Sequence, residues 1–400
     1  MFSLLGKHSE EVIAIFDIGN GSIGGALVKI SPGQAPHVLY SHREPLTFLP
    51  EVTSGRLLTS MLKLLKSVSD NVYKVSRQHS PHHGRMHVER AYCVFASPWF
   101  MSETRVINVE KGKQFIVTNE LIDELVKKEE GQFQIALKGG KYEKIFGDDV
   151  ALMEKKIIHT KLNGYEVSEP IGKKVSALEV TFFSSFISKE ILKKVEEVLL
   201  HSFSLRYVGY SSFVLASWNA VRDIYHDVDN FLFLDITGEV TDITLTMRGI
   251  LAETVSYPHG RNTLIRSVVE GLEITPEIAV SFFGMKSKGV LEKKFSSKFD
   301  GVVADALSKW HDELIETLLK LQKTHGLPRK VYVTVDSDVA DFFKTSIMAG
   351  LPAELAVHLG SFDIHVMSGE SVRPYVTVAP GDIADPFIII DSIFINKLIV

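Results

Sequence analysis

The sequence predicts an α/β fold with two lobes, and two observations lead to this prediction. Stretches typical of buried strands alternate along the 400 residues with stretches whose apolar residues recur at helical spacing. A unit made of a strand, a tight turn and a second strand occurs twice, at residues 12–30 and again within residues 231–255. Repetition of one unit in a chain long enough for two domains indicates two related halves.

The first unit, VIAIFDIGNGSIGGALVKI, carries an acidic residue to the mouth of a turn rich in glycine. Its first apolar run ends at Asp17, and Asn20-Gly21 favours a type I′ hairpin turn, in which both central residues have positive φ. Four glycines lie in or beside the turn: Gly19, Gly21, Gly24 and Gly25. Because glycine has no Cβ, backbone N–H groups here can approach an anion closely. From the turn chemistry alone, an ordinary hairpin that binds nothing is the alternative.

The composition is that of an ordinary soluble globular protein. A net charge of -5 offers no basic excess for phosphate backbones, so we expect no nucleic-acid partner. The single cysteine, Cys93, lies in an apolar run and is expected to be a buried free thiol in a reducing cytoplasm. No window has the roughly 18 continuous apolar residues that a membrane-spanning helix needs.

The first half of the chain is predicted to contain an inserted unit. A helix with one buried face is predicted over residues 57–75, followed by a polar break at 77–87. The break holds four histidines without a defined ligand geometry, so a loop is favoured over a metal site: His79, His82, His83 and His87. The elements beyond it predict a small α+β unit. They are strands at 91–96, 105–109, 154–162, 165–167 and 175–183, a helix at 119–130 and a second hairpin turn at Asn163-Gly164.

The second half alternates strands and helices around the second unit. In that unit an apolar run ends at Asp235, and a turn of small residues leads into two further strands. A late strand is predicted at 330–335. Predicted helices cover 188–201, 213–222, 262–272, 276–283, 304–324 and 339–348. The apolar segment 386–400 is predicted to form one or two buried strands.

Each unit brings an aspartate to the end of its first strand, and this pairing predicts a phosphate clamp. Two such turns can hold a phosphate chain from opposite sides with their backbone donors. A carboxylate repels phosphate, so Asp17 and Asp235 would hold a hydrated Mg²⁺ or position a water molecule instead.

With these motifs in this order, the chain resembles the actin-like ATPase superfamily, and more closely the families of the cell-division protein FtsA and the type IV pilus assembly protein PilM. Residues 17–23, DIGNGSI, resemble the first phosphate motif, and residues 234–243, LDITGEVTDI, resemble the second. Residues 163–180 are similar to the end of the extra FtsA subdomain, and residues 213–217 to the stretch before the second motif. The resemblance covers about residues 12–348.

The resemblance implies an α/β, actin-like (ribonuclease H-like) fold of two lobes with an inserted small α+β subdomain. The implied division is a first lobe of residues 11–85 and 185–205, an inserted FtsA-type subdomain of residues 86–184, a second lobe of residues 206–385 and a C-terminal strand segment of residues 386–400.

The resemblance also implies ATP and Mg²⁺ as ligands. The residues it assigns to this site are Asp17, Gly19, Asn20, Gly21 and Ser22 from the first motif and Asp235, Thr237, Gly238, Thr241 and Asp242 from the second. Asp17 and Asp235 would hold the metal through water. No catalytic residue is assigned.

Several positions depart from the family patterns and indicate a degenerate nucleotide site. In the second motif Thr237 and Glu239 replace glycines and Val240 replaces a threonine. A desolvated, unpaired Glu239 carboxylate beside phosphate would cost several kcal/mol. The Ala-Glu-x-x-Lys contact pattern reads AVSFF at residues 279–283, and DSD at residues 336–338 replaces the glycine pair expected beside adenosine.

The preferred function is an FtsA-like cytoplasmic scaffold of bacterial cell division that recruits protein partners through residues 86–184 and binds ATP weakly or not at all. The alternatives are a PilM-like component of type IV pilus assembly, an active phosphotransferase or phosphohydrolase, and a catalytically inactive structural subunit. The Asn163-Gly164-Tyr165 run favours FtsA, whereas the leader at residues 2–7 is more like PilM. We expect self-assembly and a location at the inner face of the cell membrane, reached through a partner or weakly through Phe2, Leu4 and Leu5.

Overall fold

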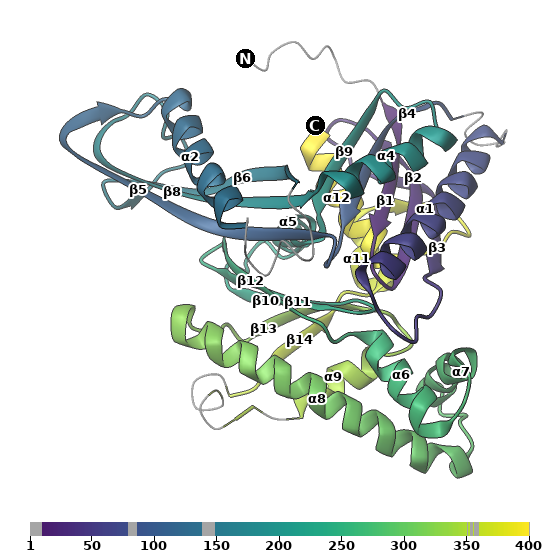
Figure 1. The fold of residues 1–400 in the computed structure, drawn as a ribbon. Coiled ribbons are helices and arrows are strands. Elements are labelled where there is room, and N and C mark those ends of the chain that lie inside the picture. The colour runs from purple at the N-terminus through teal and green to yellow at the C-terminus, as the bar shows by residue number, and fades with distance from the viewer. Residues whose placement is uncertain are drawn as a thin grey trace.

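The computed structural model describes residues 10–78, 86–137, 149–349, 351–352, 355 and 360–399. Two sheets lie one above the other, each with helices on its faces, and a third sheet extends sideways from the upper lobe (Figure 1). The leader at residues 2–7 and the histidines His79, His82 and His83 lie outside the described residues.

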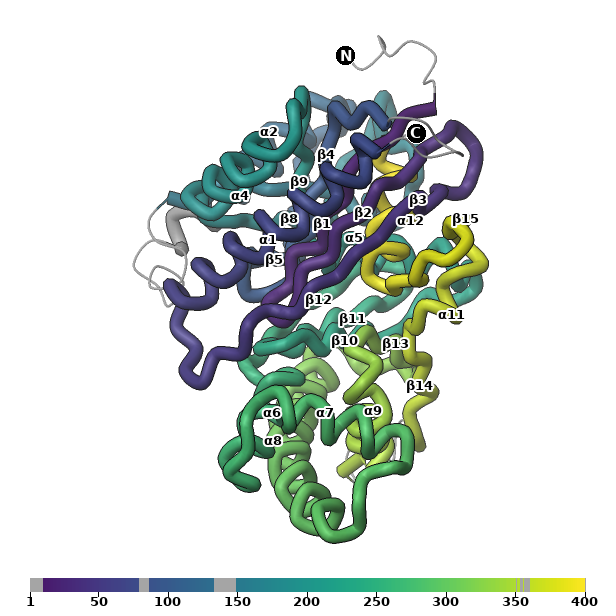
Figure 2. The backbone as a smooth tube through the Cα atoms, turned by 90° about the vertical axis from the view of Figure 1, so that its right-hand side faces the viewer, coloured from purple at the N-terminus to yellow at the C-terminus, as the bar shows by residue number. Residues whose placement is uncertain are grey.

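The first lobe is built on a six-stranded sheet in the order β15-β3-β2-β1-β4-β9. Strands β1, β2 and β3 form an antiparallel meander, and β4 and β9 continue the sheet in parallel. Helix α1 packs on β2 and beside α4, whereas α5 and α12 pack against each other (Figure 2). The bounds are β1 Glu11–Ile18, β2 Ser22–Ile30, β3 His37–Pro45, β4 Val88–Phe95, β9 Tyr207–Ser212, β15 Thr377–Val378, α1 Ser54–Arg77, α4 Lys189–Ser202, α5 Phe213–Ile224 and α12 Pro386–Ile399.

The second lobe repeats this plan with a five-stranded sheet in the order β12-β11-β10-β13-β14. Its β10, β11 and β12 form the second antiparallel meander, and β13 pairs with β10 in parallel. The bounds are β10 Phe231–Ile236, β11 Thr241–Met247, β12 Ile250–Tyr257, β13 Lys330–Val335, β14 Asp363–Val366, α6 Arg261–Leu272, α7 Pro276–Ser287, α8 Lys293–His325, α9 Ala340–Met348, α11 Gly369–Val372 and the 3₁₀ turn η1 Arg373–Tyr375. Helix α8 begins eleven residues before the predicted start at 304.

The inserted unit is an antiparallel sheet in the order β5-β8-β6-β7 with α2 packed on one face. Its bounds are β5 Phe100–Ile116, β6 Val150–Leu162, β7 Tyr165–Glu166, β8 Lys174–Ser188 and α2 Asn119–Leu137. The predicted insert began at residue 86, but β4 lies between β1 and β9 in the first sheet. A buried parallel strand and an inserted antiparallel strand have the same apolar texture, so the sequence does not separate them.

The two Asn-Gly pairs behave differently. Asn163 and Gly164 have φ of 50° and 86° and close the β6–β7 hairpin, as predicted. Neither Asn20 nor Gly21 has a positive φ, so the predicted type I′ turn between β1 and β2 is wrong. That loop is closed by a hydrogen bond from the Gly19 N–H to the Ser22 carbonyl, and the Asn20 side chain bonds Thr237 in the second lobe.

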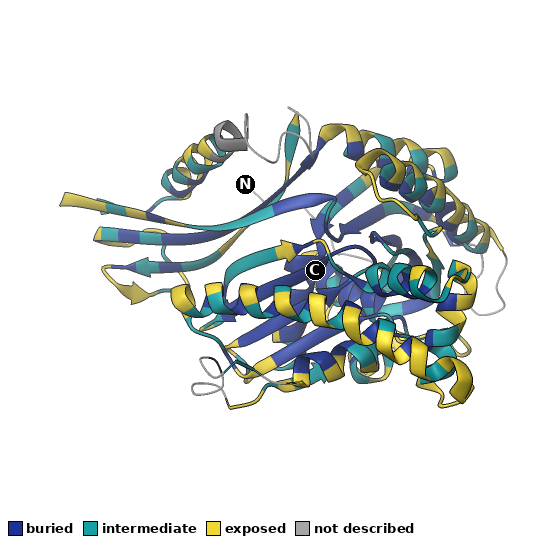
Figure 3. Cartoon of the chain, turned by 60° about the horizontal axis from the view of Figure 1, so that its bottom comes forward, coloured by how far each residue is buried: buried dark blue, intermediate teal, exposed yellow. Residues whose placement is uncertain are grey.

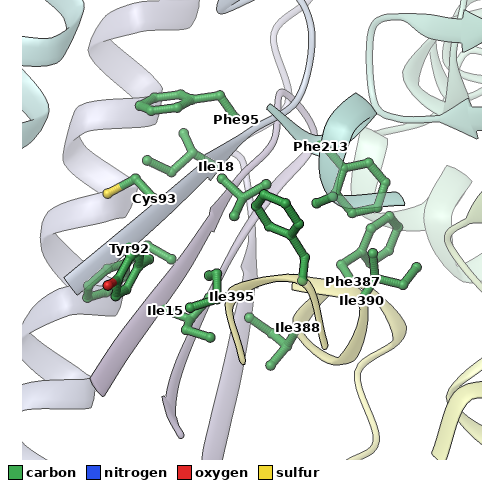
Figure 4. Packing of buried hydrophobic residues seen from close by; sticks show 14 of the residues in the cluster. Ile15, Ile18, Tyr92, Cys93, Phe95, Phe213, Phe387, Ile388, Ile390 and Ile395 are labelled. Atoms are coloured by element: carbon green, nitrogen blue, oxygen red, sulfur yellow. The ribbon is translucent and has the colours of Figure 1, made fainter. Parts of the chain in front are cut away.

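Residues 386–399 form helix α12, so the prediction of one or two strands was wrong. Asp385 caps the helix, since its carboxylate accepts the N–H groups of Phe387 and Ile388 at 3.0 and 3.3 Å. Pro386 then occupies the first turn, where it needs no donor. The helix is buried on most sides between the first sheet and α5, which removes the amphipathic spacing that would identify it (Figure 4).

Buried residues form a core at each sheet (Figure 3), and the core of the first lobe also includes Phe231, Phe233, Leu251 and Tyr332 of the second sheet. Cys93 is a fully buried free thiol, as predicted, and burial raises the pKa of its thiol. His87, the one predicted break histidine that the structure describes, pairs with Glu89 at 2.9 Å. Among the described residues there is no helix with the length and apolar character needed to cross a membrane.

Candidate functional site: the cleft between the two lobes

The two predicted turns meet in the structure. The first loop, residues 19–21, joins β1 to β2, and the second loop, residues 237–240, joins β10 to β11. They touch so closely that a Cβ on Gly21 would lie 2.7 Å from the Gly238 Cα, and one on Gly238 would lie 2.5 Å from the Gly21 Cα. Real Cβ atoms do not approach backbone this closely, so both loops require glycine at the contact.

The Asn20 side chain joins the two loops through both of its polar atoms. Its amide nitrogen donates to the Thr237 hydroxyl at 2.7 Å and to the Ser97 carbonyl, and its oxygen accepts the Glu239 N–H at 2.7 Å. The side chain is fully buried. A buried amide that is satisfied from both lobes ties them together, because separating them would leave its polar atoms unpaired.

Asp17 is paired with an arginine that the sequence analysis missed. The Arg43 guanidinium, from β3, donates to the Asp17 carboxylate at 2.7 Å, to Asp385 at 2.6 and 3.2 Å, and to the Ser22 hydroxyl at 2.9 Å. It also lies over the Phe387 ring, 4.7 Å from the ring centre. Burial raises the pKa of Asp17 and Arg43 lowers it, whereas the two carboxylates raise the pKa of Arg43 against the effect of burial.

The strand register brings Arg43 to Asp17. Asp17 stands opposite Gly24 in the β1–β2 pairing, and Gly24 stands opposite Arg43 in the β2–β3 pairing. A Cβ on Gly24 would lie 2.7 Å from an Arg43 nitrogen, so this glycine opens the path across the middle strand. Gly24 and Gly25 lie within strand β2 and not in the turn. The predicted anion-binding turn therefore does not include them.

Asp235 points into the same cleft and is only half satisfied. One of its oxygens accepts the Thr334 hydroxyl at 2.7 Å, and the other has no hydrogen-bond partner among the described residues. Burial, together with the neighbouring Asp242, raises the pKa of Asp235 well above its ordinary value. Among the described residues Asp235 thus keeps one oxygen unpaired, in contrast to Asp17, which pairs with Arg43.

The second loop is held by the start of helix α6. The N–H groups of Arg261 and Asn262 donate to the carbonyls of Thr237 and Gly238 at 2.9 and 2.7 Å. Amides at a helix N-terminus are the usual donors to a phosphate, and here they bind the loop itself. The carbonyls of the loop and the N–H groups of the helix therefore satisfy each other, and no anion is needed.

The carboxylates at the positions that depart from the family patterns, Glu239, Asp336 and Asp338, are paired with arginines. Glu239 turns away to Arg266 at 2.6 Å and to the Asn262 amide at 2.9 Å. Arg261 pairs with Asp338 at 2.5 Å and with Asp336 at 3.4 Å. The expected cost of an unpaired Glu239 therefore does not arise, since its charge is compensated within the second lobe.

Seven of the ten predicted residues line one small cavity, and Asn20, Thr241 and Asp242 do not. Those that line it are Asp17, Gly19, Gly21, Ser22, Asp235, Thr237 and Gly238. The structure adds residues that sequence reasoning missed: Arg43, Ala96, Phe213, Ile236, Asp336 and Phe387. Thr241 instead bonds the His259 carbonyl and the Trp310 indole, and Asp242 bonds Ser256. Burial raises the pKa of Asp242 to about 6.

The cavity is too small for the predicted ligands in this arrangement. Its volume is about 20 Å³, which is the space for about one water molecule. Arg43 already occupies the position beside Asp17, and the touching loops leave no room for a phosphate chain. Within the described ranges, no group of three or more His, Cys, Asp or Glu side chains is placed to hold a metal ion. The residues therefore do not fit Mg²⁺ and ATP.

The architecture can be compared with known proteins. The chain matches no family model and no curated protein sequence. Among solved structures it is similar to one of the PilM–PilN type IV pilus biogenesis complex, with 16% identity over 92% of this chain and 90% of the other, at a TM-score of 0.56. A protein with an actin-like ATPase fold from Bacteroides thetaiotaomicron has 11% identity over 89% of this chain and 91% of the other, at 0.38. The ethanolamine utilization protein EutJ from Carboxydothermus hydrogenoformans has 12% identity over 98% and 92%, at 0.44.

These findings define the class of protein at the level of the fold. The chain has the actin-like ATPase fold, with two related lobes around a cleft, as its motifs predicted. At such low identity the likeness concerns architecture alone.

Proposed function

We propose that this chain is a protein-assembly scaffold of the PilM kind, which recruits a partner through a groove at the root of its inserted sheet. The observation that carries the proposal is this open groove beside a cleft that is closed to nucleotide. Support also comes from the likeness to PilM over nearly the whole of both chains, because that protein forms a complex with PilN.

The groove lies where both lobes and the insert meet. It has a volume of about 770 Å³, within the range of about 300–1,000 Å³ typical of ligand sites. Its walls come from the segment before α1, the first turns of α1 and α4, the Pro98-Trp99 corner and the second lobe. The lining residues are Pro50, Glu51, Val52, Ser54, Gly55, Leu57, Leu58, Pro98, Trp99, Ser188, Glu190, Ile191, Glu239, Val240, Pro258 and Arg266.

The chemistry of the groove favours an apolar protein segment over an anionic small molecule. Most of its lining side chains are apolar. Each of its three carboxylates is paired with a cation: Glu51 with Arg56 at 3.0 Å, Glu190 with Lys194 at 2.6 Å and Glu239 with Arg266 at 2.6 Å. Among the described lining residues the one cation, Arg266, is thus already paired, which does not favour a phosphate, whereas an extended segment with apolar side chains would be complementary to the walls.

The pilus alternative is preferred over the division role. The FtsA resemblance rests on short motifs, whereas the likeness to PilM extends over the whole architecture. On this proposal the protein acts at the inner face of the cell membrane, and residues 86–184 position its partner. Self-assembly is a further part of the proposal. Adenosine triphosphate has no role in it.

The test uses two matched valines. Val52 lies in the groove with 39% of its surface exposed, and Val290 lies between α7 and α8 with 60% exposed. We expect Val52→Asp to lower recovery of the partner from native cells about tenfold or more, because a carboxylate disrupts an apolar contact. Val290→Asp should recover it normally.

The identity of the captured protein decides between the roles. Capture of a membrane component of pilus assembly supports the proposal. Capture of a division protein would instead favour the FtsA role for this chain. Equal capture by wild type and Val52→Asp would show that the groove is not the binding site. A direct titration of wild type and both variants with the captured protein's cytoplasmic segment completes the test.

A further inference from the structure

We propose that the cleft between the lobes is ligated by the protein's own side chains, with Arg43 in the position of a metal ion beside Asp17 and Asn20 as the link that a phosphate would make between the loops. The proposal does not depend on which partner the groove binds. It states that the closed, two-lobed form exists without any nucleotide.

Arg43 binds the carboxylates of Asp17 and Asp385 in the way that a metal ion would. Each of its three guanidinium nitrogens donates: Nε to Asp385, Nη2 to Asp17 and Asp385, and Nη1 to the Ser22 hydroxyl. Only 19% of its side chain is exposed, and the Phe387 ring covers one face. A forked pairing with Asp385 and a third carboxylate contact is the geometry for which a guanidinium is suited.

The position of Arg43 is built into the surrounding elements. Gly24 provides the opening across β2, and the α12 cap residue Asp385 supplies the second carboxylate. The Asp385 carboxylate thus caps α12 and also pairs with Arg43. Three separate elements, β1, β3 and the start of α12, converge on one cation. An incidental surface pair would not require this agreement between strand register, glycine position and helix start.

Asn20 takes the place of a phosphate between the two loops. In a nucleotide-filled cleft, donors from both loops would converge on phosphate oxygens. Here the Asn20 oxygen accepts the Glu239 N–H and its nitrogen donates to Thr237, so the amide joins the loops directly. The Gly21–Gly238 contact then removes the remaining space.

The experiment measures cation and nucleotide binding in the full chain. Mn²⁺ alone is titrated by electron paramagnetic resonance, and Mg-ATP by calorimetry, against wild type, Arg43→Ala, Arg43→Lys and Arg90→Gln. Arg90 is the matched control, because it also pairs with a carboxylate, Glu11 at 2.8 Å, and lies over the aromatic ring of Tyr207, away from the cleft.

We expect wild type, Arg43→Lys and Arg90→Gln to bind neither probe at concentrations up to about 1 mM. A Kd of that size corresponds to a binding free energy of about 4 kcal/mol, so any binding must be weaker. Arg43→Ala should bind Mn²⁺ at least tenfold more tightly than wild type, and adding Asp17→Asn should abolish this gain. If Arg43→Ala is not recovered folded, the double variant Arg43→Met, Asp385→Asn removes one charge of each sign and leaves Asp17 free to bind.

Two results would overturn the proposal. One is micromolar binding of Mg-ATP by wild type, since a self-ligated cleft has no room for it. The other is a folded Arg43→Ala variant, or a folded Arg43→Met, Asp385→Asn double variant, that binds Mn²⁺ no better than wild type does. A slower amide hydrogen exchange of the first loop in wild type upon addition of Mg-ATP would count with the first result.

Discussion

Asp391 is an aspartate in the interior of α12 that is fully buried, and neither carboxyl oxygen has a hydrogen-bond partner among the described residues. Burial and the nearby Asp17 raise the pKa of its carboxyl well above the ordinary value of 3.8, while Arg43 opposes the rise. The neutral form is therefore the one that the folded protein tolerates, because an isolated buried carboxylate is very costly.

Replacement of Asp391 by asparagine is predicted to change how stability depends on pH. The unfolded wild-type chain releases this proton above about pH 4, whereas the folded chain retains it, so rising pH favours the unfolded wild type. Asp391→Asn has no proton to release. Its free energy of unfolding should rise relative to wild type, by up to about 1.4 kcal/mol per pH unit above pH 4. Urea denaturation across the range from pH 4 to 8 measures the difference, and parallel curves would contradict the prediction.

Glu154 shows how one side chain connects an element to the rest of the molecule. From β6 of the insert, its carboxylate accepts the Ser185 hydroxyl at 2.9 Å, the Ser212 N–H at 3.0 Å and the hydroxyls of Ser211 and Ser212. Ser212 is also the N-cap of α5. The insert is thereby bonded to β9 and to the start of a core helix of the first lobe.

Removal of this carboxylate is predicted to loosen the insert. Glu154→Ala leaves several donors without an acceptor, which costs about 1–3 kcal/mol for each buried group left unpaired. We expect a lower free energy of unfolding and faster amide hydrogen exchange at Ser211 and Ser212. The matched control is Glu166→Ala at the exposed tip of the same sheet, where the side chain is 65% exposed. Equal exchange rates in wild type and Glu154→Ala would show that other contacts hold the insert.

At the scale of the whole molecule, the two lobes meet at the loops and also share a core, because Phe213 of α5 packs on Phe233 of the second sheet and Tyr225 packs on Tyr332. Asn20 provides cross-lobe hydrogen bonds at this junction, and Arg266 adds a contact to the Leu49 carbonyl at 3.5 Å. Trp99 in the groove wall also donates to the Gly19 carbonyl at 3.0 Å, so the groove and the first loop share a support. The polar contacts at the loops therefore add to an apolar junction between the lobes.

We predict that Asn20→Ala lowers the stability of the molecule and leaves its unfolding in one step. The variant loses the amide that bonds the Thr237 hydroxyl and the Glu239 N–H, which costs about 1–3 kcal/mol for each buried group left unpaired. Because the shared apolar core still couples the lobes, differential scanning calorimetry should show one transition at a lower temperature. Asn230→Ala is the control, since its oxygen accepts the Arg248 N–H within the second lobe, at 2.7 Å. A transition at the wild-type temperature in Asn20→Ala would contradict the prediction.

The sequence by itself determined the features that depend on neighbouring residues. Asp17 and Asp235 at strand ends, the Asn163-Gly164 turn and the buried Cys93 follow from local patterns, and the repeated unit predicts the two-lobed fold. Helix α12 was missed because burial on most sides removes its periodicity, although Asp385-Pro386 is a helix start signal that was present.

Only the tertiary structure decided what occupies the cleft. Arg43 reaches Asp17 because two strand registers align them across Gly24, and Asn20 finds Thr237 more than two hundred positions along the chain. Register and the approach of distant loops are set by packing of the whole sheets, which no short stretch specifies. The motifs alone predicted a nucleotide site, and the side chains brought there by folding fill it.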